Sequence, residues 1–218
     1  MKVNAPKIKF SWFTIAILLG FWLLCASFYP SLPDQVPTHW NFQGQPDGYS
    51  SKAVASLIMP LLPLGLYIFL TLLPKIDPKK DNYGKFALPY EKIRTATVLV
   101  IAGFTALPIL TSLGYNVNIS LISRIAVPLL IILNGNYLGK IRYNYFTGIK
   151  TPWTLASEEV WNKTHRVGGR MMVVGGFVSL LSLFTPPTYG MILMLAGLLV
   201  PAILAIIYSY ILYRKIAK

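Results

Sequence analysis

Four long stretches without a charged residue constrain the fold of this chain more than any other feature. They cover residues 10–33, 53–74, 95–123 and 171–213. A helix needs about 20 apolar residues to cross the hydrocarbon core of a bilayer. The first two stretches are therefore long enough for one span each, and the other two are long enough for more. Only 12% of the residues are charged, about half the usual fraction of a soluble domain.

Turn signals divide the two longer stretches. "TPPTYG" at 185–190 reads as a tight turn between two helices, and "GYNVN" at 114–118 breaks the stretch before it. We therefore expect an all-α, polytopic membrane protein with six transmembrane helices. The predicted spans are 10–29, 53–73, 95–113, 119–138, 168–185 and 189–212.

The basic residues indicate the orientation of these spans. Of 20 Lys and Arg, 18 lie before span one, between spans two and three, between spans four and five or after span six, when Arg170 in the first turn of span five is counted with the segment before it. Six spans put these four segments on one side, and positive residues mark the cytoplasm. Both termini are therefore expected inside. Attraction to anionic lipid explains the net charge of +13 without nucleic acid, so the expected partner is the bilayer.

The segment between spans one and two then faces outside. Its prolines exclude a helix, and "QPDG" at 45–48 has the residue order of a type I turn. His39 with Asp34 and Asp47 is a thin set of metal ligands, so we expect no metal and no cofactor. Two interpretations stay open: His39 and Trp40 cap the bundle at the outer interface, or the loop binds an external ligand.

The segment 147–170 between spans four and five is the second unusual one. A helix is expected to start after Pro152, capped by Thr154 or Ser157. We interpret it as an interfacial helix that leads into span five, with Trp153 and Trp161 as anchors. Neighbouring helix positions such as Glu158 and Glu159 do not face one shared bond, so an acid/base pair and an enzyme are not expected.

Arg124 stands out because it lies about six residues into predicted span four, and charges inside a span are functional candidates by default. It either snorkels to the outer interface or joins a polar pocket with Asn116, Asn118 and the outer loop. Small residues at helical spacing predict close packing of spans five and six. They are Gly168, Gly175, Ser179 and Ser182 in span five, and Gly190, Gly197, Pro201, Ala205 and Ser209 in span six.

Two strings resemble known families. "LPDQVPTHWNFQGQPDGYSSK" is similar to an extracytoplasmic domain of unknown function in bacterial membrane proteins. "NGNYLGKIRYNYFTGIKTPWTLASEEVWNKTHRVGGR" and the final spans resemble the SdpI family. We therefore divide the chain into an N-terminal part, 1–94, and an SdpI-like four-span part, 95–218. The resemblance implies a six-span protein of the bacterial cytoplasmic membrane that gives immunity to a secreted peptide toxin, with a signalling role in some members.

The resemblance also supplies the candidate site residues. Those outside are Pro37, Thr38, His39, Trp40, Gly44 and Gly48, to which the same stretch adds Asn41 and Asp47 as candidate ligand-binding residues. Those inside are Thr151, Pro152, Trp153, Thr154, Glu158, Trp161 and Arg166.

Two functions compete at this point. The first is immunity, in which the protein binds the toxin peptide at the membrane. The alternative is a sensor that relays an external signal to a cytoplasmic partner such as a transcriptional repressor. A transporter is the weakest candidate, because ion pathways use intramembrane carboxylates or histidines and no predicted span contains one.

Overall fold

The structure is a computed structural model that describes residues 8–216. Six of its helical segments are long and apolar enough to cross a membrane, which confirms the predicted number of spans. The main helices are α1 (Trp12–Ser27), α2 (Leu62–Ile76), α3 (Ala87–Ser112), α4 (Ile119–Leu138), α6 (Glu158–Leu180) and α7 (Pro187–Ile216). A short helix, α5 (Pro152–Ala156), precedes α6.

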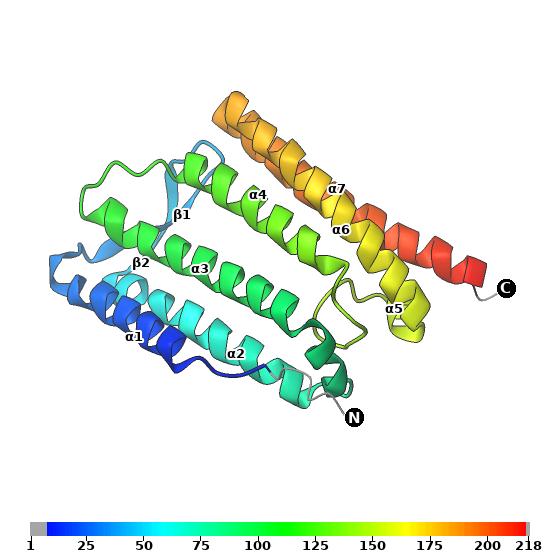
Figure 1. The fold of residues 1–218 in the computed structure, drawn as a ribbon. Helices are drawn as coiled ribbons and strands as arrows, with labels where there is room; N and C mark the ends of the chain where they lie inside the picture. Colours follow the sequence, from blue (N-terminus) through cyan, green and yellow to red (C-terminus); the bar gives the residue numbers. More distant parts are fainter. Residues whose placement is uncertain (1–7, 217–218) are drawn as a thin grey trace.

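The helices form two adjoining groups, α1–α3 and α4 with α6 and α7 (Figure 1). Leu18, Tyr67 and Val98 form the buried contact between α1, α2 and α3. In the second group the backbones themselves meet: a Cβ on Gly135 would lie 2.8 Å from the carbonyl oxygen of Gly169. Close backbone approach at small residues is how membrane helices pack without a hydrophobic driving force.

The two ends of the bundle differ in structure. One end, which we call the hairpin end, carries strands β1 (Gln35–Trp40) and β2 (Pro46–Ser51) and the turns that follow α3 and α6. The other, which we call the basic end, carries α5, the loop 139–151 and the first residue described, Ile8, together with the end of α7 (Figure 1). The basic residues at 2, 7 and 218 lie outside the described residues.

The predicted span boundaries hold for α4 and are wrong for two others. Predicted span four is 119–138, and α4 is Ile119–Leu138, with the Asn118 side chain accepting the Leu121 amide as its N-cap. However, α3 begins at Ala87 rather than 95, and α6 at Glu158 rather than 168. The parts of α3 and α6 that precede the predicted starts carry charged residues, which the charge-free windows excluded. The helices can extend beyond their apolar parts because backbone hydrogen bonds between residues four apart form whether the side chains are apolar or charged.

The loop between α1 and α2 contains a β-hairpin that the sequence analysis did not predict. Strands β1 and β2 pair antiparallel, from Gln35 with Ser51 to Trp40 with Pro46. The expected turn at 45–48 is wrong, because Pro46–Gly48 belong to β2. The chain reverses at 41–45 instead. The Asn41 side chain accepts the amides of Gln43 and Gln45, each at 3.0 Å, and Gly44 adopts a φ of 81°, which favours glycine.

Candidate functional site

The hairpin connects the two helix groups at its end of the bundle. At its base, Val36 is fully buried in a cluster with residues of α1 and α3. At its tip, the side-chain amide of Gln43 donates from Nε2 to the Thr188 hydroxyl in α7 at 3.1 Å. Gly44 lies against Ser120 in α4, where an added Cβ would be 3.4 Å from the Ser120 Cβ. The hairpin is therefore an ordered cap that contacts both groups.

The outer surface of this cap is polar and aromatic. The His39 Nδ1 and Asp47 Oδ1 atoms lie 2.5 Å apart, and the two side chains are 73% and 42% exposed. Gly48 lies directly against His39, since a Cβ at Gly48 would be 2.9 Å from the His39 Cβ. Phe42 and Tyr49 are 44% and 59% exposed. Such aromatic rings offer large, rigid contact areas at low entropic cost.

Polar pairs hold the two strands together. The hydroxyls of Thr38 and Ser50 are 3.0 Å apart, and Lys52 forms an ion pair with Asp34 at 2.9 Å. The hydrogen bond and the charge of Lys52 hold the pKa of the Asp34 carboxyl below its usual value, and Asp34 in turn raises the pKa of Lys52.

Of the three metal ligands considered from the sequence, only His39 and Asp47 lie together. Asp34 pairs with Lys52 and not with His39. Within residues 8–216 no three His, Cys, Asp or Glu side chains are grouped to hold a metal ion.

Two of the other outer candidates have structural tasks. Asn41 holds the turn through its side-chain oxygen. At position 44 the positive φ and the close contact with Ser120 both favour glycine. Pro37 and Trp40 are half-buried. His39 and Asp47 are therefore the outer candidates with the most accessible functional groups.

Arg124 neither snorkels to the interface nor forms the pocket considered with Asn116 and Asn118. Its side chain is 7% exposed, and its Nη1 donates to the carbonyl oxygens of Ser182 at 2.6 Å and Thr185 at 2.9 Å. These carbonyls follow the end of α6, where no backbone N–H of the helix is available to donate to them. The cation therefore caps the α6–α7 turn, and Gly190 leaves room for it.

At the basic end, the motif residues are mostly engaged with one another. Thr151 caps α5 in a capping box with Thr154, and the Thr151 hydroxyl also lies 3.0 Å from the Ser209 hydroxyl in α7. Ser157, one of the two predicted caps, caps α6. The motif thus fixes the corner between loop 139–151 and α6, while Pro152, Glu158 and Arg166 stay exposed.

The interpretation of Trp161 as an interfacial anchor is wrong. Trp161 is fully buried in a cluster with residues of α3 and loop 139–151. Its indole N–H donates to the Ile141 carbonyl at 3.1 Å, and its ring stacks on His165 at a centroid distance of 4.0 Å. The predicted interfacial helix is replaced by the short α5 and by α6, which runs into the membrane without a break. Trp153, half-buried, packs against Tyr210.

Several polar residues at the basic end are buried, which their sequence context does not indicate. The Asp77 carboxylate accepts the Tyr83 hydroxyl at 2.9 Å and the Tyr145 amide at 3.0 Å. Asn144, with no exposed surface, accepts the amides of Phe146 and Thr147. The Asp77–Tyr145 bond joins the α2–α3 segment to loop 139–151, and Asn144 holds that loop in shape. Asp77 and Asn144 lie in polar segments where their sequence context gives no sign of burial.

His165 in α6 and Arg94 in α3 are two further buried polar residues, and both lie outside the predicted spans. The His165 Nδ1 is 2.8 Å from the Trp161 carbonyl, and its Nε2 accepts the Ile149 amide at 2.9 Å. Only a neutral ring, with the proton on Nδ1, satisfies both bonds. Arg94 is 5% exposed in α3; it donates to the Thr71 hydroxyl at 2.7 Å and lies over the Tyr67 ring.

Comparisons with known proteins find similarity in both the N-terminal and the C-terminal parts of the chain. Residues 15–64 match a domain of unknown function (DUF1648). The chain is 29% identical over 206 residues to the immunity protein SdpI of Bacillus subtilis (strain 168), which covers 91% of this chain and 96% of that protein. No solved structure matches the chain. Together with the spans, the similarity makes this a multi-pass protein of the bacterial cytoplasmic membrane. Residues 140–209 match the SdpI/YfhL protein family.

Proposed function

We propose that this chain is a membrane immunity protein, which protects its cell by binding a secreted, membrane-active peptide at the hairpin end. The similarity to an immunity protein runs along nearly the whole length of both chains, with 91% of this chain and 96% of that protein covered. It therefore includes the hairpin as well as the 140–209 segment. The family relationship favours a role in binding over a role in catalysis.

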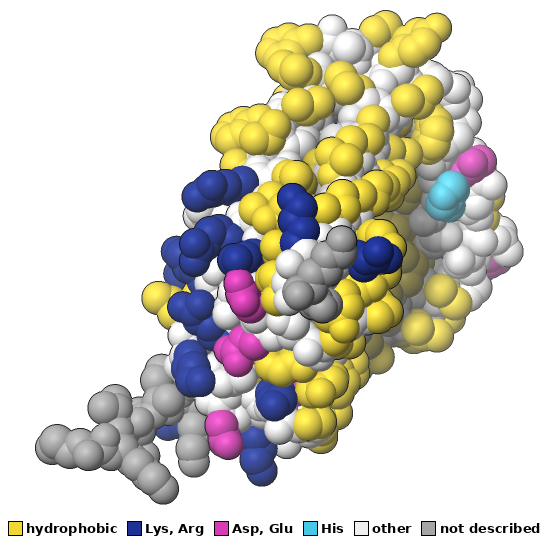
Figure 2. All heavy atoms as spheres, turned by 90° about the vertical axis from the view of Figure 1, so that its right-hand side faces the viewer, with side chains coloured by type: hydrophobic (Ala, Val, Ile, Leu, Met, Phe, Trp, Pro, Cys, Tyr) yellow, Lys and Arg dark blue, Asp and Glu magenta, His cyan; other side chains and the backbone are white. Residues whose placement is uncertain are grey.

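The orientation that this function requires has the hairpin end outside the cell. The described Lys and Arg residues of the four basic segments lie in or next to the basic end, apart from Arg94 in α3 and Arg170 in α6. Figure 2 shows Lys and Arg side chains gathered over the lower part of one face, below a largely hydrophobic upper part. Positive residues favour the cytoplasmic side, so the hairpin would meet a peptide that arrives from outside.

The observation that carries the proposal is the surface of the hairpin. It is fixed to both helix groups by Val36, Gln43 and Gly44, yet it leaves His39, Phe42 and Tyr49 exposed. A preorganised surface loses little conformational entropy when it binds. Exposed aromatic rings on a rigid cap are therefore suited to hold an amphipathic peptide before it inserts into the bilayer.

The first test is deletion of the gene, followed by challenge with a panel of secreted membrane-active peptides. We expect the deletion strain to be more sensitive than its parent to at least one peptide. Equal sensitivity to every peptide would reject the immunity function. A change in the transcription of neighbouring genes without any change in survival would favour the sensor, in which the exposed Glu158 and Arg166 contact a cytoplasmic regulator.

The second test asks whether the hairpin surface is the binding site. Phe42→Ser and Tyr49→Ser remove exposed rings, so membrane abundance and thermal stability should stay at the wild-type level. Truncation of an aromatic anchor often costs more than ~2 kcal/mol of binding, so we expect about 30-fold weaker protection. Tyr145→Ser, at an exposed ring of the basic end, is the matched control and should protect normally. Full protection by both hairpin variants would exclude this surface.

A further inference from the structure

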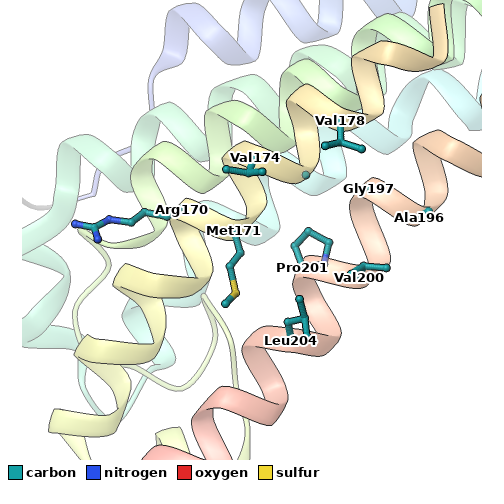
Figure 3. A pocket seen from close by; sticks show the side chains of 10 residues that line it. Arg170, Met171, Val174, Val178, Ala196, Gly197, Val200, Pro201 and Leu204 are labelled. Atoms are coloured by element: carbon teal, nitrogen blue, oxygen red, sulfur yellow. The ribbon is translucent and has the colours of Figure 1, made fainter.

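A groove runs along the lipid-facing side of α6 and α7. Its volume is about 480 Å³, within the range of about 300–1,000 Å³ that small-molecule sites occupy. Figure 3 shows its two walls, with Met171 and Leu204 directed into the space between the helices. Residues 170–178 of α6 form one wall, a length of about 12 Å at the helical rise. Residues 196–204 of α7 form the other wall.

The contact between two glycines makes this groove. A Cβ on Gly197 would lie 2.5 Å from the Gly175 carbonyl oxygen, so no side chain fits between the helices there. Exposed apolar side chains flank this contact on both helices: Val174 in α6 is 62% exposed, and Val200 in α7 is 51% exposed. Exposed apolar walls of this kind face hydrocarbon in a membrane-spanning segment. The natural occupant of the groove is therefore an acyl chain.

One end of the groove carries a positive charge. Along the exposed side of α6, Lys163, Arg166 and Arg170 are followed by Val174 and Val178, so the surface changes from basic to apolar after Arg170. Lys163 pairs with Glu159, whereas no ion pair or hydrogen bond involves Arg170 among residues 8–216. In Figure 3 its side chain extends away from α7, toward the start of α6.

We propose that this groove is a binding site for an anionic phospholipid, with one acyl chain between α6 and α7 and the phosphate on Arg170. An unpaired guanidinium at the boundary between basic and apolar surface gains a partner from the headgroup, because arginine forms charge-assisted bonds to phosphate. The site is independent of the hairpin surface. It is expected to stabilise the tightest helix contact in the SdpI-like segment whether or not a peptide is bound.

The test uses the purified full-length chain in mild detergent, with phosphatidylglycerol or phosphatidylcholine of the same acyl chains added. We expect phosphatidylglycerol to be retained in native mass spectra and to raise the melting temperature more than phosphatidylcholine does. Arg170→Gln should weaken this retention about fivefold, the change expected when one basic contact to anionic lipid is lost. Ala196→Phe, which fills the groove from its exposed side, should abolish the preference.

Two matched variants serve as controls. Lys92→Gln removes an exposed charge that does not line the groove, and Leu199→Phe adds bulk to an exposed position of α7 outside it. Both should keep the preference for phosphatidylglycerol. Equal retention of the two lipids, or full retention by Arg170→Gln or Ala196→Phe, would overturn the proposal. A dimer that Ala196→Phe dissociates would also overturn it, by assigning the groove to a second copy of the chain.

Discussion

Two tryptophans of the basic end look equivalent in the sequence and differ in the structure. Trp161 is fully buried, hydrogen-bonded to Ile141 and stacked on His165. Trp153 is half-buried and shares one ring contact with Tyr210. Truncation of a buried aromatic residue costs about 3–5 kcal/mol, whereas an aromatic pair contributes about 0.5–1.5 kcal/mol. We therefore expect Trp161→Ala to lower the free energy of unfolding by about 3–5 kcal/mol and Trp153→Ala by far less.

The measurement is thermal or denaturant unfolding in detergent, followed by circular dichroism because both variants alter tryptophan fluorescence. Trp161→Phe adds a useful intermediate, since it keeps a ring for stacking but loses the indole bond to Ile141. It should fall between the wild type and Trp161→Ala. Equal losses for Trp153→Ala and Trp161→Ala would restore the view that both residues anchor an interfacial helix.

The environment of a buried cation is also hard to predict from the sequence. Arg94 follows Lys92 and Glu91 and looks like part of a loop, but Thr71 and Tyr67 surround it. Arg124 looks like a snorkelling residue, but its partners are carbonyls 58 and 61 residues further along the chain. The charge of each residue is visible in the sequence. Its partner is not, because that depends on which helices lie side by side.

At the scale of elements, apolar length and caps predicted the helices well and the hairpin not at all. α4 is bounded by a capping Asn118 and by Gly139, so its limits could be predicted from the sequence. The hairpin has Pro37 and Pro46 in its strands, and proline argues against strands except at edges and strand starts. A two-stranded sheet has only edges, so these prolines are tolerated. The contacts of the tip with α4 and α7 were not visible in the sequence.

The stripe of small residues is an element-scale prediction that the structure confirms and sharpens. Gly175 meets Gly197 and Pro201 in α7, whereas Gly103 in α3 has open space where its Cβ would lie. Gly175→Leu should therefore separate α6 from α7 and sharply reduce the yield of folded protein, while Gly103→Leu should be tolerated. Size-exclusion profiles and melting temperatures of the two variants measure the difference. Similar behaviour of the two variants would mean that the α6–α7 contact is not critical.

At the scale of the whole molecule, the charge pattern predicts an orientation that the fold makes testable. The hairpin and the α5 corner lie at opposite ends of the bundle (Figure 1), so one accessible cysteine at each end reports the topology. Gln45 and Ala156 are exposed positions suited to this purpose. The native Cys25 is buried and unpaired, and Cys25→Ser removes it as a source of background.

We expect Gln45→Cys, in the Cys25→Ser background, to react with a membrane-impermeant maleimide in intact cells. Ala156→Cys should react only after the membrane is permeabilised, because most of the basic residues accompany it and positive residues are retained in the cytoplasm. Labelling of both cysteines in permeabilised cells is the control for their accessibility. Reversed labelling in intact cells would place the basic end outside, and a peptide arriving from outside would then meet the TPWTL corner instead of the hairpin. The same experiment therefore decides which of the two candidate surfaces is available to an external ligand.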